Sequence, residues 1–254
     1  MFNHFVHLFN TGMPSPRPPR SGARRSEAAA ARPDRQMAIL LAAEKLFAQR
    51  GYHGVTIREI AEEAGVPLAL VGYYYGPKHE LFHAIFVHWQ ATAEQRLTLL
   101  DEVIQSPGKG DRLRQVVEAF VRPVLAQRAS AEGEYYAQLV ARELARQTPE
   151  TQRVLGEFFD PLAHRFIDAL HATRPGCDRT LVAWAYQFAL GALLHHISDH
   201  RMPTLSRGHA QANDPAAGDL LVDFITAGVG ALLPVSRTPR PRAPASSSTN
   251  RRQP

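Results

Sequence analysis

The segment from Arg35 to Leu81 alternates apolar helical stripes with glycine and proline breaks, which restricts it to a few short helices. In its first part, apolar side chains recur at three- and four-residue steps, the period of an amphipathic α-helix. These residues are Ile39, Leu40, Ala43, Leu46 and Phe47. Gly51 follows where such a helix would end. The spacing therefore predicts a first helix that packs one face on a core.

Two short helices are predicted next. Thr56 is followed three positions later by Glu59, the spacing of a capping box in which each side chain satisfies a backbone N–H at a helix start. We expect this helix to run to about Ala64, where a glycine follows. Pro67 then restarts the chain, since proline is tolerated in a first helical turn. A third helix is expected over Leu68–Tyr74.

A fourth, longer helix is predicted to open after Gly76 and Pro77 and to continue to about Ile104. Its apolar stripe consists of Leu81, Phe82, Ile85, Phe86 and Trp89. Two short helices joined by a tight glycine-containing turn, and braced by longer ones, make a helix-turn-helix. The second helix of such a unit can lie in the major groove of DNA.

Four runs of residues in this segment resemble those of a known protein family. They are Ala-Glu-Lys-Leu-Phe from Ala43, Arg-Gly-Tyr from Arg50, Thr-Ile-Arg-Glu-Ile-Ala-Glu-Glu-Ala-Gly-Val from Thr56, and Tyr-Tyr-Tyr-Gly-Pro-Lys-His-Glu-Leu-Phe from Tyr73. In order and spacing this segment resembles the DNA-binding domain of the TetR family of bacterial repressors. It departs from the family at Leu68, which cannot hydrogen-bond a base edge, and at Gly72, where members commonly carry a large residue.

The resemblance implies a set of DNA-contacting residues. They are Thr56 and Arg58 at the start of the second helix, Leu68, Ala69, Tyr73 and Tyr74 on the third, and Lys78 at the start of the fourth. Lysine near a helix N-terminus suits a phosphate oxygen, and a tyrosine hydroxyl can donate to phosphate. The Arg58 guanidinium can reach a guanine edge bidentately. Its alternative role is an ion pair with Glu62, four residues on.

The positive charge of the chain is concentrated at its two ends. Residues 1–35 hold six arginines against two acids, and residues 235–254 hold five arginines and no acid, so the net charge of +5 leaves −4 for residues 36–234. Both ends are rich in proline and lack apolar periodicity, so we expect disordered basic tails over 1–33 and 235–254. The first is either an arm on DNA phosphates or a solvated extension, and Met13 is an alternative start.

The body, residues 81–234, has helical stripes almost throughout and no strand signals. We therefore expect an all-α chain, with a three-helix helix-turn-helix domain over 34–80 and a larger helical domain over 81–234. The resemblance implies that the larger domain binds an effector and dimerises, its last two long helices forming a four-helix interface. Large apolar side chains that can line an effector pocket, or else fill the core, are Phe120, Tyr136, Phe159 and Trp184.

The sequence gives only weak indications of a metal site or of catalysis. His196 and His200 lie one helical turn apart, beside His195 and Asp199. A metal there is the less favoured alternative to a structural role, because no glutamate stands between the histidines. Cys177 is the single cysteine, which excludes an intramolecular disulfide. We find no phosphate loop or nucleophile motif and no apolar run long enough for a membrane span, so no enzyme, catalytic residue, cofactor or metal is predicted.

The sequence thus predicts a cytoplasmic, homodimeric, DNA-binding transcriptional regulator. We expect it to repress by binding a palindromic operator in double-stranded DNA, and to be released by a small-molecule effector. One alternative is an architectural DNA binder of little sequence preference that uses its arginine-rich tails. Another is a metal-dependent enzyme built on the histidine cluster.

Overall fold

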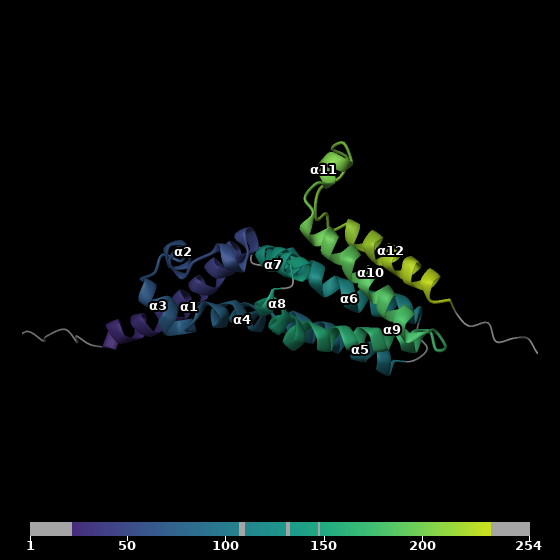
Figure 1. The fold of residues 1–254 in the computed structure, drawn as a ribbon, viewed down its shortest axis with the longest axis horizontal. Helices are drawn as coiled ribbons and strands as arrows, with labels where there is room; N and C mark the ends of the chain where they lie inside the picture. Colours follow the sequence, from purple (N-terminus) through teal and green to yellow (C-terminus); the bar gives the residue numbers. More distant parts are fainter. Residues whose placement is uncertain (1–21, 107–109, 131–132, 147, 235–254) are drawn as a thin grey trace, which may run out of the picture.

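The computed structural model describes the backbone of residues 22–106, 110–130, 133–146 and 148–234. Every regular element in these ranges is a helix, as predicted (Figure 1). Helices α1 to α4 form one end of an elongated molecule, and the remaining helices pack lengthwise beside one another to form the other end. The short helix α11 projects from the body.

The predicted helix-turn-helix is present, and its two short helices have nearly the predicted bounds. Its helices are α1 (Gly22–Arg50), α2 (Ile57–Glu63), α3 (Leu68–Tyr75) and α4 (Lys78–His88), with a 3-10 turn at Tyr52–Gly54. Gly65 and Gly76 have φ of 65° and 68°, a left-handed conformation that glycine adopts without a Cβ penalty. These two glycines turn the chain before and after α3.

Helix α1 begins earlier than the sequence suggested. It starts at Gly22, so residues 22–33, predicted to be part of a disordered tail, are helical. A run of alanines at 28–31 accounts for this, because alanine has the highest intrinsic helix propensity. Residues 1–21 and 235–254, the rest of the two predicted tails, lie outside the described residues.

The long helix predicted from Pro77 to Ile104 is divided in two. Helix α4 ends at His88 and α5 covers Gln90–Gln105. At the junction Trp89 has φ −92° and ψ 5°, outside helical geometry, and its indole N–H donates to the buried Glu44 carboxylate at 2.6 Å. Neither glycine nor proline marks this break, which explains why the prediction was wrong here.

The larger domain comprises α6 (Arg112–Arg128), α7 (Gly133–Arg146), α8 (Pro149–Val154), a π-helical turn (Leu155–Phe159), α9 (Asp160–Thr173), α10 (Arg179–Ser198), α11 (Met202–Leu205) and α12 (Ala217–Leu232). Thr148 caps α8, its side chain accepting from the Thr151 N–H. Pro161 stands in the first turn of α9, where its missing N–H costs nothing.

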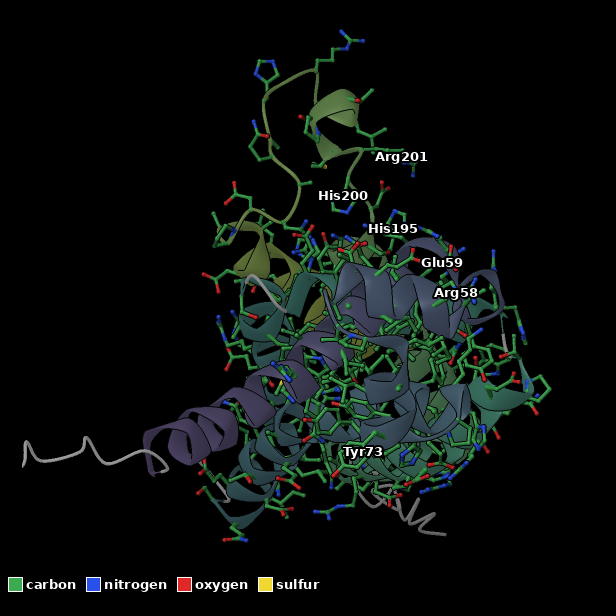
Figure 2. The ribbon with its side chains drawn as sticks, turned by 90° about the vertical axis from the view of Figure 1, so that its left-hand side faces the viewer. Arg58, Glu59, Tyr73, His195, His200 and Arg201 are labelled. Carbon is green, nitrogen blue, oxygen red and sulfur yellow. The ribbon has the colours of Figure 1, made fainter. Side chains whose placement is uncertain are left out.

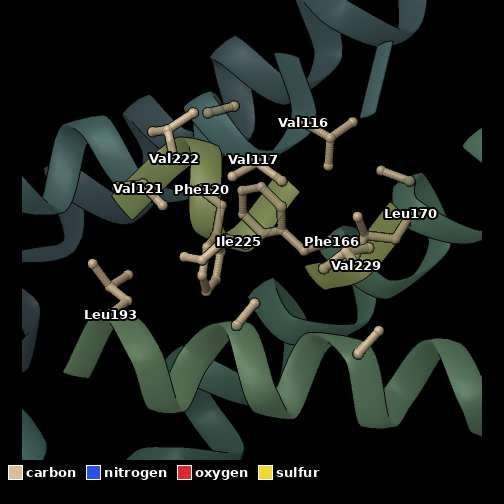
Figure 3. Packing of buried hydrophobic residues seen from close by; sticks show 14 of the residues in the cluster. Val116, Val117, Phe120, Val121, Phe166, Leu170, Leu193, Val222, Ile225 and Val229 are labelled. Atoms are coloured by element: carbon tan, nitrogen blue, oxygen red, sulfur yellow. The ribbon is translucent and has the colours of Figure 1, made fainter. Parts of the chain in front are cut away.

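Two cores hold the molecule together. One joins α5, α6, α9, α10 and α12, with Phe120 edge-on to Phe166 at a centroid distance of 5.2 Å (Figure 3). The other joins α1 to α4 with Leu139, Val140 and Val154 of α7 and α8. The DNA-binding unit therefore shares a core with the larger domain.

Candidate DNA-binding surface and internal cavity

The start of α2 is fixed by the capping box that the sequence predicted. The Thr56 hydroxyl accepts from the Glu59 N–H at 3.3 Å, and the Glu59 carboxylate accepts from the Thr56 N–H at 2.8 Å. These hydrogen bonds, together with the nearby Arg50 guanidinium, lower the pKa of Glu59. Because the Thr56 hydroxyl also donates to Glu59, this side chain positions α2.

Arg58 is the exposed cation of this helix. Its side chain lies on the face formed by the α1–α3 end of the molecule, as does Tyr73 (Figure 2). Within the described residues Arg58 makes no ion pair, so the alternative pairing with Glu62 is not formed. By contrast, Lys45 pairs with Glu63 and Arg50 pairs with Glu59 on the same unit. The Arg58 guanidinium is therefore available to a ligand.

Helix α3 is anchored by Val71, which is fully buried, and presents the opposite face to solvent. That face carries Leu68, Ala69 and Tyr73, the last 76% exposed, and no charged side chain. Tyr74 is half-buried and packs edge-on against Tyr73 at 5.2 Å. Methyl and aromatic groups of this kind suit thymine methyls and sugar-phosphate contacts better than hydrogen bonds to bases.

Lys78 is only half-exposed and is folded inward. Its ammonium lies 4.3 Å from the centroid of the Tyr52 ring, a cation–π contact, and 5.9 Å from that of Phe47. Desolvation by these neighbours lowers the Lys78 pKa. The lysine thus braces the start of α4 as well as standing at a helix N-terminus.

A cavity of about 350 Å³ lies inside the larger domain and is lined by residues of α4 to α7, the π turn, α9 and α10. Two of the four predicted pocket residues, Tyr136 and Phe159, line it. The other two do not. Phe120 is buried in the core between Phe166 and Tyr186, and Trp184 is 55% exposed on the outer face of α10.

Several polar residues of the cavity lining were not predicted from the sequence, and two of them are withdrawn from solvent. Arg96 of α5 is 8% exposed, and Gln127 of α6 is half-buried. Both line the cavity. A signal for Arg96 was present, because it lies three residues after Ala93 and four before Leu100, on the apolar face of its helix. A charged residue at such a position is worth attention.

The histidine cluster at the end of α10 is held by ion pairs. His195 and Arg201 both contact the Asp199 carboxylate, at 3.1 and 2.7 Å (Figure 2). Burial lowers the pKa of His196. The described part of the chain contains no group of three or more histidine, cysteine or acidic side chains placed to hold a metal ion. None of its helices is long and apolar enough to span a membrane.

Comparison with known proteins gives two curated relatives. The chain is 35% identical over 95 residues to the HTH-type transcriptional regulator HbdR of Aromatoleum sp. (strain CIB), a match that covers 37% of this chain and 41% of that protein. It is 31% identical over 90 residues to the HTH-type transcriptional activator FasR of Mycolicibacterium smegmatis, covering 35% of this chain and 40% of that one. Each match thus spans less than half of the relative.

Solved structures share the fold over most of the chain. The fatty acid degradation regulator FadR from Bacillus halodurans has a TM-score of 0.55 at 17% identity, covering 76% of this chain and 95% of that one. The hemolysin II transcriptional regulator HlyIIR has a TM-score of 0.53 at 20% identity, covering 79% and 97%. FadR from Bacillus subtilis in complex with stearoyl-CoA has 0.50 at 16%, covering 76% and 98%.

Family profiles match both parts of the chain. Residues 39–85 match the bacterial regulatory proteins of the tetR family, and residues 118–228 match the tetracyclin repressor-like C-terminal domain. The first range contains the helix-turn-helix and the second contains most of the cavity-bearing domain. The chain belongs to the TetR family of bacterial transcriptional regulators.

Proposed function

We propose that this protein is a dimeric repressor that binds a palindromic DNA operator and is released when a small molecule occupies the internal cavity. The observation that carries the proposal is that α4 begins directly after α3 and ends at the cavity, where Phe86 and Trp89 form part of the wall. A ligand against that wall acts on the helix next to the DNA-contacting face. The proposed activity is regulation in the cytoplasm, without catalysis.

Dimerisation is supported by an apolar face on α10 and α12, which lie side by side (Figure 1). Trp184 and Phe188 stack at 5.8 Å and are 55% and 58% exposed. On α12, Leu220 and Phe224 are each 68% exposed. A contiguous exposed face of large apolar side chains is typical of a protein interface. We propose that the same pair of helices from a second copy covers it, forming a four-helix interface with two-fold symmetry.

The proposed two-fold symmetry also predicts the form of the operator. Two copies of α3 related by a two-fold axis would enter successive major-groove faces, so the half-sites form a palindrome. Ligand binding would favour a dimer state in which the spacing of the two α3 helices no longer matches the groove, which is a shift of population between two states. The curated relative FasR is an activator, and activation is the second direction in which such a shift can act.

The test is capture of fragmented genomic DNA from the source organism by the full-length protein at near-physiological salt, followed by sequencing. We expect one enriched palindrome. A matched variant replaces arginines of both tails by glutamine, at Arg17, Arg20, Arg237, Arg240, Arg242, Arg251 and Arg252. Retention of the same palindrome by this variant supports a specific regulator. Capture without sequence enrichment that is lost in the variant would instead identify an architectural binder.

A further inference from the structure

Arg96 is a buried cation without an ionic partner. Its side chain lies on α5, is 8% exposed and lines the cavity. Within the described residues its guanidinium forms no ion pair, and its Nε has no hydrogen-bond partner. A buried arginine is normally paired, because removing its charge from water is costly.

The groups around Arg96 only partly replace the water that would otherwise solvate its charge. The guanidinium carbon lies 4.8 Å from the centroid of the Phe120 ring and 5.1 Å from that of Phe166, so two aromatic faces stabilise the charge. Burial lowers the pKa of Arg96 to about 10. The side chain therefore remains a cation at neutral pH and is held against the core, and among the described residues no acceptor pairs with its Nε–H.

A second unused donor belongs to the same cavity. The Gln127 side-chain nitrogen on α6 is buried and has no hydrogen-bond partner among the described residues. Asp160, at the start of α9, is the one acidic residue of the lining; it is exposed and does not pair with Arg96. Most of the remaining wall is apolar or aromatic, including Phe86, Val140, Leu155, Phe158, Ile167 and Leu193.

We infer that the cavity binds a small organic acid whose carboxylate pairs with Arg96 and accepts a hydrogen bond from Gln127, while its apolar chain or ring lies against the hydrophobic wall. This inference rests on the proposed function, because it names the chemical class of the effector. An anionic headgroup would supply the acceptors that the protein does not, and charge-assisted hydrogen bonds of this type are the stronger ones. A cationic ligand is disfavoured by the same arginine.

The test compares acids with alcohols of the same carbon skeleton. The probes are hexanoate and hexanol, decanoate and decanol, and cinnamate and cinnamyl alcohol, each titrated into the full-length protein by calorimetry. We expect at least one acid to bind roughly 10- to 100-fold more tightly than its alcohol, the factor that one charged hydrogen bond supplies. This comparison needs no variant.

Two variants then test whether Arg96 causes the preference for the acid over its alcohol. Arg96→Met keeps a long apolar side chain and removes the donors, and we expect it to bind acid and alcohol alike. Arg165→Met removes an exposed arginine that pairs with Asp101 outside the cavity lining, and it should retain the preference. If Arg96→Met does not fold, Arg96→Lys takes its place and should keep a reduced preference for the acid.

The outcomes separate this inference from the proposed function. Alcohols that bind as tightly as their acids, or a preference that survives Arg96→Met, would overturn the role of Arg96 and leave a ligand-binding cavity intact. If no acid or alcohol binds, the organic-acid inference is overturned. A regulator that captures its palindrome with no acid able to release it would retain the DNA-binding function and lose this class of effector.

Discussion

Arg58 is the side chain of α2 that we expect to recognise a base. It is exposed and forms no ion pair with the described part of the chain, while the exposed face of the neighbouring α3 carries apolar and tyrosine side chains. We predict that Arg58→Ala relaxes the preference at one base position at a cost of about 1–3 kcal/mol. Titration of single-base variants of the operator measures this, with Glu62→Ala as the control. Uniform weakening across all variants would show that Arg58 contacts phosphate instead.

Lys78 is expected to act differently, because it packs on Tyr52 and also stands at the N-terminus of α4, where we predict a phosphate contact. Lys78→Ala should weaken binding to all sequences by a similar factor and lower the salt slope by about one. It should also cost about 0.5–1 kcal/mol of unfolding free energy through the lost contact with Tyr52. Salt titrations and urea unfolding measure the two effects. An unchanged salt slope would remove Lys78 from the interface and leave only its structural role.

We predict that Tyr75 makes the free energy of unfolding depend on pH in the alkaline range. Its hydroxyl donates to the Gln36 carbonyl at 2.9 Å, and burial raises its pKa to about 12. The folded protein thus holds this proton more tightly than the unfolded chain, whose tyrosines titrate near about pH 10. This contribution is present below about pH 10 and is lost as the pH rises towards 12.

The comparison is with Tyr75→Phe, which lacks the titrating group. The variant should be less stable by about 1 kcal/mol at neutral pH, and the difference between the two proteins should shrink above about pH 10. Urea unfolding across this range measures it. A constant difference would show that Tyr75 does not titrate with folding.

At the scale of single residues, the sequence predicted the helix positions of Arg58 and Tyr73 better than it predicted the cavity lining. The spacing of the motif put Arg58 near the start of α2 and Tyr73 on the short helix α3, so their positions followed from the predicted helix boundaries. For Phe120 and Trp184 the helical period showed that each lies on an apolar face of its helix. It did not show whether that face packs in the core, lines the cavity or contacts a second copy of the chain. Arg96 was missed because a lone arginine in a helix is ordinarily taken as part of a solvated face.

Among the elements, α7 connects the cavity to the DNA-binding unit. Tyr136 and Val140 line the cavity. Elsewhere on the helix the Arg142 guanidinium donates to the Ala48 and Gln49 carbonyls, at 3.3 and 3.2 Å, at the C-terminus of α1. A cation suits that position because helix C-termini carry unsatisfied carbonyls and partial negative charge.

We predict that Arg142→Ala costs about 1.5–3 kcal/mol of unfolding free energy, the range for hydrogen bonds to a charged group. Arg142→Lys should recover part of it, since lysine keeps the charge but not the fork of donors. Denaturant unfolding measures both variants. Equal loss in the two would show that packing of the arginine stem, and not the cap, stabilises this junction.

Element boundaries were predictable where glycine, proline or a capping residue marks them, as at Thr56, Gly76 and Thr148. They were not predictable at Trp89, where the break accompanies a hydrogen bond to Glu44 on a different helix. That contact joins residues 45 apart in the chain, so no local pattern contains it. The same holds for Arg142, whose acceptors on α1 are more than ninety residues away.

For the whole molecule, the proposed symmetric interface makes the sharpest prediction. Phe188 and Phe224 are exposed on adjacent helices, so a polar substitution there should leave the monomer folded. In a two-fold interface each residue occurs twice. Burial of one phenylalanine is worth about 1.5–3 kcal/mol, so Phe188→Asp or Phe224→Asp should raise the dimer dissociation constant by at least ~100-fold.

Sedimentation equilibrium and circular dichroism check this together, with Ile104→Asp, which is 40% exposed at the far end of α5, as the matched control. We expect the control to dimerise and both phenylalanine variants to be helical monomers. The variants should also lose the palindrome but keep weak binding to a single half-site, because each monomer retains one helix-turn-helix. Variants that remain dimeric would place the interface elsewhere, and the spacing of the half-sites would then have to follow from a different pair of helices.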